Sequence, residues 1–420
     1  MNTEGAVPSP TQPLSDWLAW LETIHPVSID MGLDRVSRVA DRLALRPARK
    51  PLILVGGTNG KGSTVAMLNA IYQSAGYKVG AYTSPHIQHF CERICVDGQP
   101  VAEQAVIDAL AYIEAQRAPD TLTYFEYTTL AAMRVFNQLD CDVLLIEVGL
   151  GGRLDATNIW DADCSIITSI ALDHEEYLGS DVSVIATEKA AIGRHGRPFI
   201  VGDASPPASL GQYVKAHGFM LVDVGSQPVS ELPQPSLPGD YQRRNAACAK
   251  AAVQALQERL PVSANLIASA LAVVRVPGRF EQLQVGGVPV VLDVAHNPAG
   301  AQALVSAWQE QQGAIKCDLL FATLGDKDID GVIASLAPIV QHWHCVTLDV
   351  PRAKTAAKLA EQVSQVVHTS SVTQYNAIPD GASAALASAH ANHRPLLVAG
   401  SFYTIAAVQP LLLKAPAMTV

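Results

Sequence analysis

The stretch Leu52-Ile-Leu-Val-Gly-Gly-Thr-Asn-Gly-Lys-Gly-Ser-Thr64 constrains the fold more than any other part of the chain. Four apolar residues lead into glycines, a lysine and a serine, and the segment Thr64–Gln73 reads as a helix. Glycines let the backbone turn sharply and direct successive N–H groups inward, and a helix N-terminus adds positive potential. The sequence therefore predicts a strand, a phosphate-binding loop and a helix, in that order.

The loop departs from the usual phosphate-loop pattern. G-x-x-x-x-G-K-[ST] would require glycine at Val55 and Ser or Thr at Gly62. Here Gly62 separates Lys61 from Ser63, but Lys61 can still contact the outer phosphates and Ser63 can still reach a magnesium ion. A glycine-rich turn with an exposed lysine is the alternative, and the order of strand, glycines, lysine, hydroxyl and helix disfavours it.

Length and composition predict a globular chain of two or three domains. The chain has 420 residues, of which 49% are hydrophobic and 16% charged, so it can bury a sizeable core. Its net charge of −10 argues against a nucleic-acid binder that works through a basic patch. The seven cysteines contain no C-x-x-C pair, which argues against a disulfide scaffold and a cysteine zinc site.

No targeting or membrane segment is predicted. Residues Met1–Pro13 lack a basic region followed by an apolar run, and no stretch approaches 18 apolar residues without charge. We therefore expect a soluble, cytoplasmic protein.

Alternating strands and helices predict an α/β fold. Cys141–Val148 and Ser165–Ile170 are nearly continuous apolar runs, typical of a parallel sheet covered on both faces. Residues 203–240 are rich in Pro, Ser and Gly and show no strong periodicity. After Pro277-Gly-Arg-Phe280 a second strand–helix series begins. We predict a P-loop-type, mainly parallel sheet domain over 1–280 and a smaller Rossmann-like domain over 281–420.

Three polar residues follow buried segments of the first domain. Glu147 ends an apolar strand, where it could hold magnesium; the alternative is a salt bridge to Arg153. His174 is as compatible with a hydrogen-bonding role as with a metal ligand, because magnesium prefers oxygen. Lys189 reads by chemistry alone as a solvated helix lysine. If buried and neutral, it could instead react with carbon dioxide and become an anionic oxygen ligand.

The second domain carries its own polar turn. Asp293, His296 and Asn297 follow an apolar strand, and Pro298 ends it. Each domain thus has polar residues after an apolar strand, and these two sets together predict a cleft that holds substrates. A buried Asp–His pair without a ligand is the structural alternative.

Taken together, the motifs resemble one family, the Mur-ligase-like folylpolyglutamate synthases, and among them the bacterial bifunctional dihydrofolate synthases/folylpolyglutamate synthases. The matching pieces lie in the family's order along nearly the whole chain. They are Gly57–Ser63, Thr83–His86, Tyr124–Tyr127, Glu147–Asp155, Leu172–His174, Glu188-Lys189, Arg244-Asn245, Pro277–Phe280, Asp293–Pro298 and Gly400–Tyr403. The family's loop has the Gly62 spacing.

This resemblance implies an ATP-dependent amide ligase with an acyl-phosphate intermediate. A substrate carboxylate takes the γ-phosphate of ATP, and the amine of L-glutamate then displaces phosphate. The implied cofactors are ATP and two magnesium ions, with Lys189 carbamylated to hold the second ion. The implied substrates are dihydropteroate, reduced folates and L-glutamate, and the family resemblance also suggests a monomer.

Residue roles carried over from the family fall into four groups. The nucleotide-binding group is Thr58, Asn59, Gly60, Lys61, Gly62, Ser63, Thr64, Asn245, Arg279 and Asp293. The metal ligands are Ser63, Glu147, His174 and Lys189. The catalytic group is Lys61, Lys189, Asp293 and His296. The substrate-binding group is Ser84, Pro85, Thr123, Phe125, Asp155, Ala156, Asn158, His296 and Ser401.

The substrate pocket is the part with the most alternatives. An aromatic ring stacked on a pterin beside a carboxylate is chemically sensible, but Phe125 could be ordinary core. Asp155 could pair with Arg153 or cap the following turn. Two other functions stay open. They are a monofunctional folylpolyglutamate synthase, and a P-loop nucleotide-dependent regulator without ligase activity.

Overall fold

The chain divides into two compact units. The computed structural model describes residues 6–25, 29–368 and 370–414, so the first five residues of the Met1–Pro13 segment lie outside the described part. One unit comprises Met1–Gln234 and Arg244–Val274, and the other comprises Pro235–Arg243 and Arg275–Val420. The short segment Pro235–Arg243 thus belongs with the C-terminal unit, although the chain afterwards returns to the N-terminal one.

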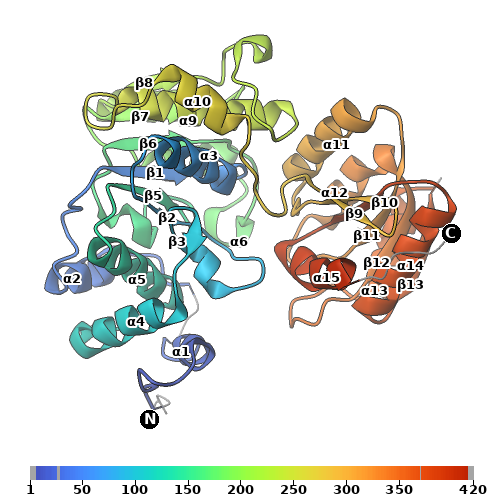
Figure 1. The fold of residues 1–420 in the computed structure, drawn as a ribbon, viewed down its shortest axis with the longest axis horizontal. Coiled ribbons are helices and arrows are strands. Elements are labelled where there is room, and N and C mark those ends of the chain that lie inside the picture. The colour runs from blue at the N-terminus through green and yellow to red at the C-terminus, as the bar shows by residue number, and fades with distance from the viewer. Residues whose placement is uncertain (1–5, 26–28, 369, 415–420) are drawn as a thin grey trace. The chain divides into compact units, whose positions relative to one another are not determined.

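Within the described residues, the N-terminal unit contains an eight-stranded sheet in the order β4-β3-β2-β5-β1-β6-β7-β8 (Figure 1). All its pairings are parallel except those of β3 with β2 and β4. The strands are β1 (Leu52–Gly56), β2 (Val79–Tyr82), β3 (Ile94–Val96), β4 (Gln99–Pro100), β5 (Val143–Glu147), β6 (Cys164–Ile167), β7 (Pro198–Val201) and β8 (Met220–Asp223).

The described helices of this part of the chain occur singly or in consecutive pairs between the strands. They are α1 (Leu14–Leu21), α2 (Asp34–Arg42), α3 (Lys61–Ser74), α4 (Glu103–Arg117), α5 (Tyr124–Gln138), α6 (Glu175–Leu178), α7 (Val182–Ala190), α8 (Ala208–His217), α9 (Asp240–Ala255) and α10 (Ala264–Leu271). Three short 3₁₀ helices are η1 (Phe90–Arg93), η2 (Ala156–Ile159) and η3 (Val229–Glu231).

Both faces of the central strand β1 of the N-terminal sheet are buried. Successive side chains of a strand point to opposite faces. Leu52 and Leu54 of β1 belong to the core cluster that also contains residues of α4 and α5. Ile53 and Val55 point the other way and are equally buried, with 0% exposure. A strand buried on both faces reads as a continuous apolar run, which is why β1 and β5 were predictable from sequence.

The C-terminal unit is a smaller sheet flanked by helices, as Figure 1 shows. Its six described strands run in the order β13-β12-β11-β14-β10-β9, and only β9 is antiparallel to its neighbour. They are β9 (Glu281–Val285), β10 (Val288–Leu292), β11 (Cys317–Phe321), β12 (Val340–Val346), β13 (Ser371–Tyr375) and β14 (Leu396–Ala399). The helices are α11 (Pro298–Gln312), α12 (Ile329–Leu336), α13 (Ala356–Val366), α14 (Ile378–Ala391), α15 (Phe402–Lys414) and the 3₁₀ turn η4 (Ala337–Ile339).

The predicted fold class, two mainly parallel α/β sheets in sequence, is confirmed. The irregular reading of 203–240 is wrong in part, because this segment contains α8 and β8. None of the helices among the described residues combines the length and apolar character that a membrane crossing requires.

Candidate active site

The phosphate loop lies between β1 and α3, in the predicted order of strand, loop and helix. Gly57 and Gly60 adopt φ angles of 139° and 93°, and Gly60 is the N-cap of α3. A Cβ atom on Gly57 would lie 2.0 Å from Oγ1 of Thr168, and one on Gly60 would lie 2.5 Å from Oδ1 of Asn245. Glycine is therefore required at both positions, and Asn245 lies against the loop.

Residues after β6 hold the loop in place. The hydroxyls of Thr168 and Ser169 donate to the carbonyl of Asn59 at 2.7 and 3.0 Å. The backbone N–H of Thr58 donates to the carbonyl of Ser169 at 2.7 Å, and its hydroxyl donates to that of Ala171 at 3.1 Å. No role was predicted for Thr168, Ser169 or Ala171 from the sequence. The available signal was a run of hydroxyl residues at a strand end, beside a glycine loop.

Two lysines share one carbonyl of the loop. Lys61 Nζ donates to the carbonyl oxygens of Gly57 and Thr58, each at 3.1 Å. Lys189 Nζ donates to the same Gly57 oxygen at 3.2 Å. Two ammonium groups this close repel each other, so the site favours a neutral amine on one of them.

Lys189 is the buried member of this pair. Its side chain is on α7, and the residue is only 5% exposed. Burial, followed by the charge of Lys61, lowers the pKa of Lys189 to about 7. The reading of a solvated lysine is therefore wrong. A substantial fraction of neutral amine at neutral pH is what a reaction with carbon dioxide requires.

A glycine of the segment after β5 allows this burial. A Cβ atom on Gly152 would lie 2.6 Å from the carbonyl oxygen of Glu188 and 3.0 Å from Cα of Lys189. Arg153 N–H donates to that Glu188 carbonyl at 2.9 Å. The glycine segment therefore packs backbone to backbone against α7, next to the lysine.

Glu147 ends β5 and lies near the first turn of α3. Its Oε2 accepts from the N–H of Ser84 at 3.4 Å, and a Cβ atom on Gly62 would be 3.5 Å from the same oxygen. Ser63, the next residue, is also buried. A carboxylate and a hydroxyl at this position suit a hard divalent cation. The alternative pairing of Glu147 with Arg153 is wrong, because Arg153 pairs with Glu188 at 2.7 Å.

His174 occupies a special backbone position. It is exposed, adopts a left-handed φ of 54°, and is the N-cap of the short helix α6. Its N–H is held by Oδ1 of Asp173 at 2.8 Å. The role of His174 as a metal ligand stays a prediction.

Phe125 packs against the start of the Gly149–Asp155 segment, and Asp155 ends that segment. The Phe125 ring leaves no room for a side chain at position 149, since a Cβ atom there would lie 2.4 Å from the ring. Asp155 is buried and accepts from Leu150 N and Thr157 N at 2.8 and 2.9 Å. Asp155 therefore caps the following turn η2, and its alternative pairing with Arg153 is wrong. Burial raises the pKa of its carboxyl group.

Asn158 carries an unsatisfied acceptor. Its Nδ2 donates to the carbonyls of Arg153 and Ala191 at 3.1 and 3.3 Å. Its Oδ1 is buried and has no hydrogen-bond partner. An N–H group of a ligand would donate a hydrogen bond to Oδ1 and so remove the free-energy cost of the unsatisfied acceptor. The neighbouring Ala156 is also buried, with 5% exposure.

The hydroxyl of Thr123 is used inside the fold. It accepts from Glu126 N at 3.3 Å as the N-cap of α5, and the Glu126 carboxylate accepts in return from Thr123 N at 2.6 Å. This is a capping box, whose T-x-x-E pattern is visible in the sequence.

A single carboxylate organises the Ser84-Pro85 loop. Glu92 accepts from the backbone N–H groups of Ile87, Gln88 and His89 at 2.7, 2.9 and 2.7 Å. Sequence reasoning missed Glu92 because only the fold brings three N–H groups to it.

In the C-terminal unit, Asp293 lies just after β10. It is buried and accepts from the N–H groups of Phe280 and Ala295, each at 2.8 Å. Burial raises the pKa of this carboxyl, while the nearby Arg279 opposes the shift. The two hydrogen bonds therefore fix the orientation of the Asp293 carboxylate at the end of β10.

Phe402 lies between two predicted site residues of the same unit. The Arg279 guanidinium is 5.0 Å from the centre of its ring, and the His296 ring centre is 6.2 Å away. Nδ1 of His296 contacts the carbonyl oxygen of Val294 at 2.9 Å, which fixes the orientation of the imidazole. Ser401 directly precedes α15, and its hydroxyl accepts from Thr404 N at 3.0 Å.

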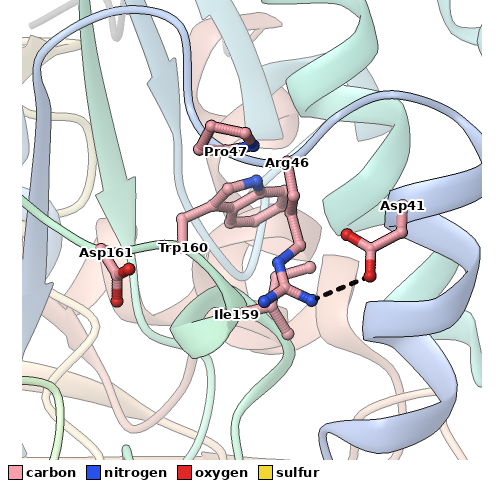
Figure 2. Close-up of a pocket in the computed structure, with 6 residues that line it drawn as sticks. All are labelled: Asp41, Arg46, Pro47, Ile159, Trp160 and Asp161. Atoms are coloured by element: carbon pink, nitrogen blue, oxygen red, sulfur yellow. Dashed lines mark hydrogen bonds and ion pairs between the residues drawn. The ribbon is translucent and has the colours of Figure 1, made fainter.

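A pocket of about 240 Å³ lies elsewhere in the N-terminal unit. Figure 2 shows that its polar lining includes Arg46 paired with Asp41, at 3.5 Å. Asp161, also in the lining, pairs with Arg194 at 2.6 Å. Because its charges are already paired and none of its lining residues is a predicted site residue, this pocket is not the site of the chemistry.

Comparisons with known proteins decide the family. The Mur ligase middle domain model matches residues 55–227, and the model of the Mur ligase glutamate ligase domain matches residues 278–402. The dihydrofolate synthase/folylpolyglutamate synthase of Escherichia coli (strain K12) is 40% identical over 418 residues, covering 96% of each chain. The chain belongs to the dihydrofolate synthase/folylpolyglutamate synthase family of Mur ligases.

Solved structures of this ligase family are similar to the chain over nearly all of its length. The structure of E. coli FolC in complex with DHPP and ADP has a TM-score of 0.87 and 38% identity, covering 96% of this chain and 98% of that one. A bifunctional enzyme from Yersinia pestis, complexed with AMPPNP and Mn ion, has a TM-score of 0.86 and 38% identity, covering 97% and 99%. The predictions of the family and of a ligase are confirmed.

Proposed function

We propose that this chain is a bifunctional ligase that adds L-glutamate to dihydropteroate, giving dihydrofolate, and to reduced folates, giving folylpolyglutamates. It uses ATP and a divalent metal ion. The observation that carries the proposal is the buried Lys189, which contacts the phosphate loop at Gly57. A nucleotide switch does not require a buried amine beside the phosphate loop. A ligase that holds phosphates through metal ions can use the carbamate of Lys189 as an oxygen ligand for a metal ion.

The reaction is a phosphoryl transfer followed by an acyl transfer. A carboxylate oxygen of the folate substrate attacks the γ-phosphorus of ATP, and ADP leaves. The glutamate nitrogen then attacks the acyl carbon, loses a proton, and the tetrahedral intermediate expels phosphate. Both steps move negative charge between oxygens, so fixed positive charges and N–H groups lower their barriers.

We assign the phosphate contacts to the loop and the metal contacts to its neighbours. The loop N–H groups and Lys61 hold the phosphates of ATP, with Asn245 lying beside Gly60. Ser63, Glu147, His174 and carbamylated Lys189 would hold two magnesium ions. Bound magnesium neutralises charge on the transferred phosphoryl group.

For the substrates, we assign Ser84, Pro85, Phe125, Asp155 and Asn158 to the pteroate pocket. The unpartnered Asn158 Oδ1 is suited to accept from an N–H group of the pterin. In the C-terminal unit we assign Arg279 and Asp293 to the nucleotide, and His296 and Ser401 to the reaction centre and glutamate. Thr123 supports the pocket by capping α5. We propose that the enzyme acts as a monomer in the cytoplasm.

A single assay tests the function. ADP release should require dihydropteroate, L-glutamate, ATP and Mg²⁺ together, and a reduced folate should replace dihydropteroate. Turnover only with reduced folates would establish the monofunctional alternative. ATP hydrolysis that does not depend on glutamate would establish a nucleotide-dependent regulator instead.

The loop held by Glu92 gives a test of the pteroate site. Glu92→Gln should raise the KM for dihydropteroate about tenfold and leave the KM for ATP unchanged, because three N–H groups lose a charged acceptor. Glu103→Gln, at an exposed position on α4, is the matched control. An equal rise in both KM values would show that the loop does not serve the pteroate site specifically.

A further inference from the structure

The C-terminal unit holds a second group of potential metal ligands, apart from the ligase residues. Asp318 is on β11, and His342 and His344 are on the neighbouring strand β12, with Asp318 directly opposite His342. Residues 342 and 344 point to the same face because strand side chains alternate. One Asp318 oxygen and one nitrogen of each imidazole all lie within 4.8 Å of one another.

Burial makes this cluster unusual. Asp318 is 0% exposed and His344 is 1% exposed. Nε2 of His344 is buried without a hydrogen-bond partner, and its 3.7 Å distance to Oδ2 of Asp318 is too long for a hydrogen bond. An unsatisfied buried nitrogen is destabilising unless something binds it.

Hydroxyl groups of β13 orient both imidazoles. Nδ1 of His344 contacts the hydroxyl of Tyr375 at 3.2 Å, and Nε2 of His342 contacts that of Thr373 at 2.8 Å. Metal-binding histidines typically have one ring nitrogen on an outer hydrogen-bonding partner in this way. The two rings stack with their centres 4.0 Å apart, so one ring has to turn for both imidazoles to direct a nitrogen at the same ion.

Two donors hold the carboxylate of Asp318, and one of them, the Arg394 guanidinium, places a positive charge beside it. Arg394 donates to Oδ1 at 2.7 Å and Ser388 to Oδ2 at 2.5 Å. An ionised carboxylate has about four acceptor positions, so Oδ2 can still coordinate a cation.

We propose that Asp318, His342 and His344 bind a divalent transition-metal ion of the zinc class. Two imidazoles and one carboxylate suit Zn²⁺, Co²⁺ or Ni²⁺ better than Mg²⁺, which prefers oxygen ligands only. Three protein ligands leave a fourth position for water. Because the ligands come from adjacent strands, the ion would fasten β11 to β12 and stabilise the C-terminal unit.

The test adds Zn²⁺ to the metal-free, full-length protein in the presence of excess Mg²⁺, which saturates the oxygen-rich ligase sites. We expect one equivalent of Zn²⁺ to bind and to raise the temperature of unfolding. Tyr375→Phe, which removes only the outer partner of His344, should weaken binding about tenfold. His342→Gln and His344→Gln should weaken it more. His368→Gln, at an exposed position of the same unit, should have no effect.

Cobalt gives a second readout that does not depend on how the variants fold. Co²⁺ bound to wild-type protein should give visible absorption bands that Zn²⁺ removes, without the near-ultraviolet band of a cobalt–thiolate bond. Binding of Zn²⁺ that is equal in wild type, Tyr375→Phe and His344→Gln would overturn the proposal. So would a thiolate band, or the absence of any Zn²⁺ binding in excess Mg²⁺.

Discussion

Lys189→Ala should lower the rate of ADP release by about 100-fold or more while the fold remains intact. The Lys189 amine is buried and donates to the same Gly57 carbonyl oxygen as Lys61. Removing one group that stabilises the charge of the transition state typically lowers kcat by about 100-fold or more. The assay is steady-state turnover with saturating ATP, dihydropteroate and glutamate, and circular dichroism checks the fold.

Small carboxylic acids provide the control for this variant. If Lys189 acts as a carbamate, formate or acetate should partly restore the activity of Lys189→Ala, because each can place an oxygen anion in the vacated space. The same acids should leave wild type unchanged. Wild-type activity in the alanine variant would contradict the role of Lys189.

The lowered pKa of Lys189 also makes the free energy of unfolding depend on pH. The folded pKa of about 7 lies below the unfolded value near 10.5, so the unfolded chain binds more protons between these values. Stability should therefore rise as pH increases from about 7 towards 10, by an amount of a few kcal/mol in buffer free of carbon dioxide. Lys189→Met should remove this rise and be the more stable protein at pH 7.

Glu147→Gln is the second change with a large expected effect. The neutral amide keeps the size of the side chain but removes the anionic oxygen beside Gly62 and Ser84. We expect kcat to fall about 100-fold and half-saturation by Mg²⁺ to move to higher concentration. The measurement is turnover as a function of Mg²⁺ concentration at fixed ATP.

An exposed acid supplies the comparison for Glu147→Gln. Glu258→Gln removes one negative charge from the same unit at an exposed position, so it should behave as wild type. An unchanged Mg²⁺ dependence in Glu147→Gln would exclude this carboxylate as a metal ligand.

The strands buried on both faces were predictable because burial imposes a continuous apolar run. β1 and β5 have five buried residues each; β1 begins with the apolar run at Leu52, and β5 lies inside the apolar run Cys141–Val148. Among the strands that were not predicted are β9 (Glu281–Val285) and β13 (Ser371–Tyr375), the two edge strands of the C-terminal sheet. β9 has one buried residue and β13 has none, so neither forms a buried apolar run. Their pairing depends on a neighbour that the local sequence does not contain.

Site residues were predictable where a polar side chain lies at the end of an apolar strand. They were not predictable where the role of a side chain depends on contacts between segments far apart in the sequence. Glu147 and Asp293 both follow continuous apolar strands. The burial of Lys189 could not be predicted, because it depends on the backbone contact between Gly152 and Glu188. Sequence patterns also do not distinguish a ligand-binding hydroxyl from a cap, as Thr123 and Ser401 illustrate.

The assignment of Pro235–Arg243 to the C-terminal unit has a consequence for dissecting the protein into fragments. Tyr241 packs against the core cluster of that unit, and the N–H of Gly239 donates to Glu310 Oε2 at 3.0 Å. A fragment that begins near residue 275 would lack both contacts and expose the apolar surface that Tyr241 covers. A soluble C-terminal fragment would therefore need residues 235–243 joined to 275–420 by a linker, rather than a single cut in the chain.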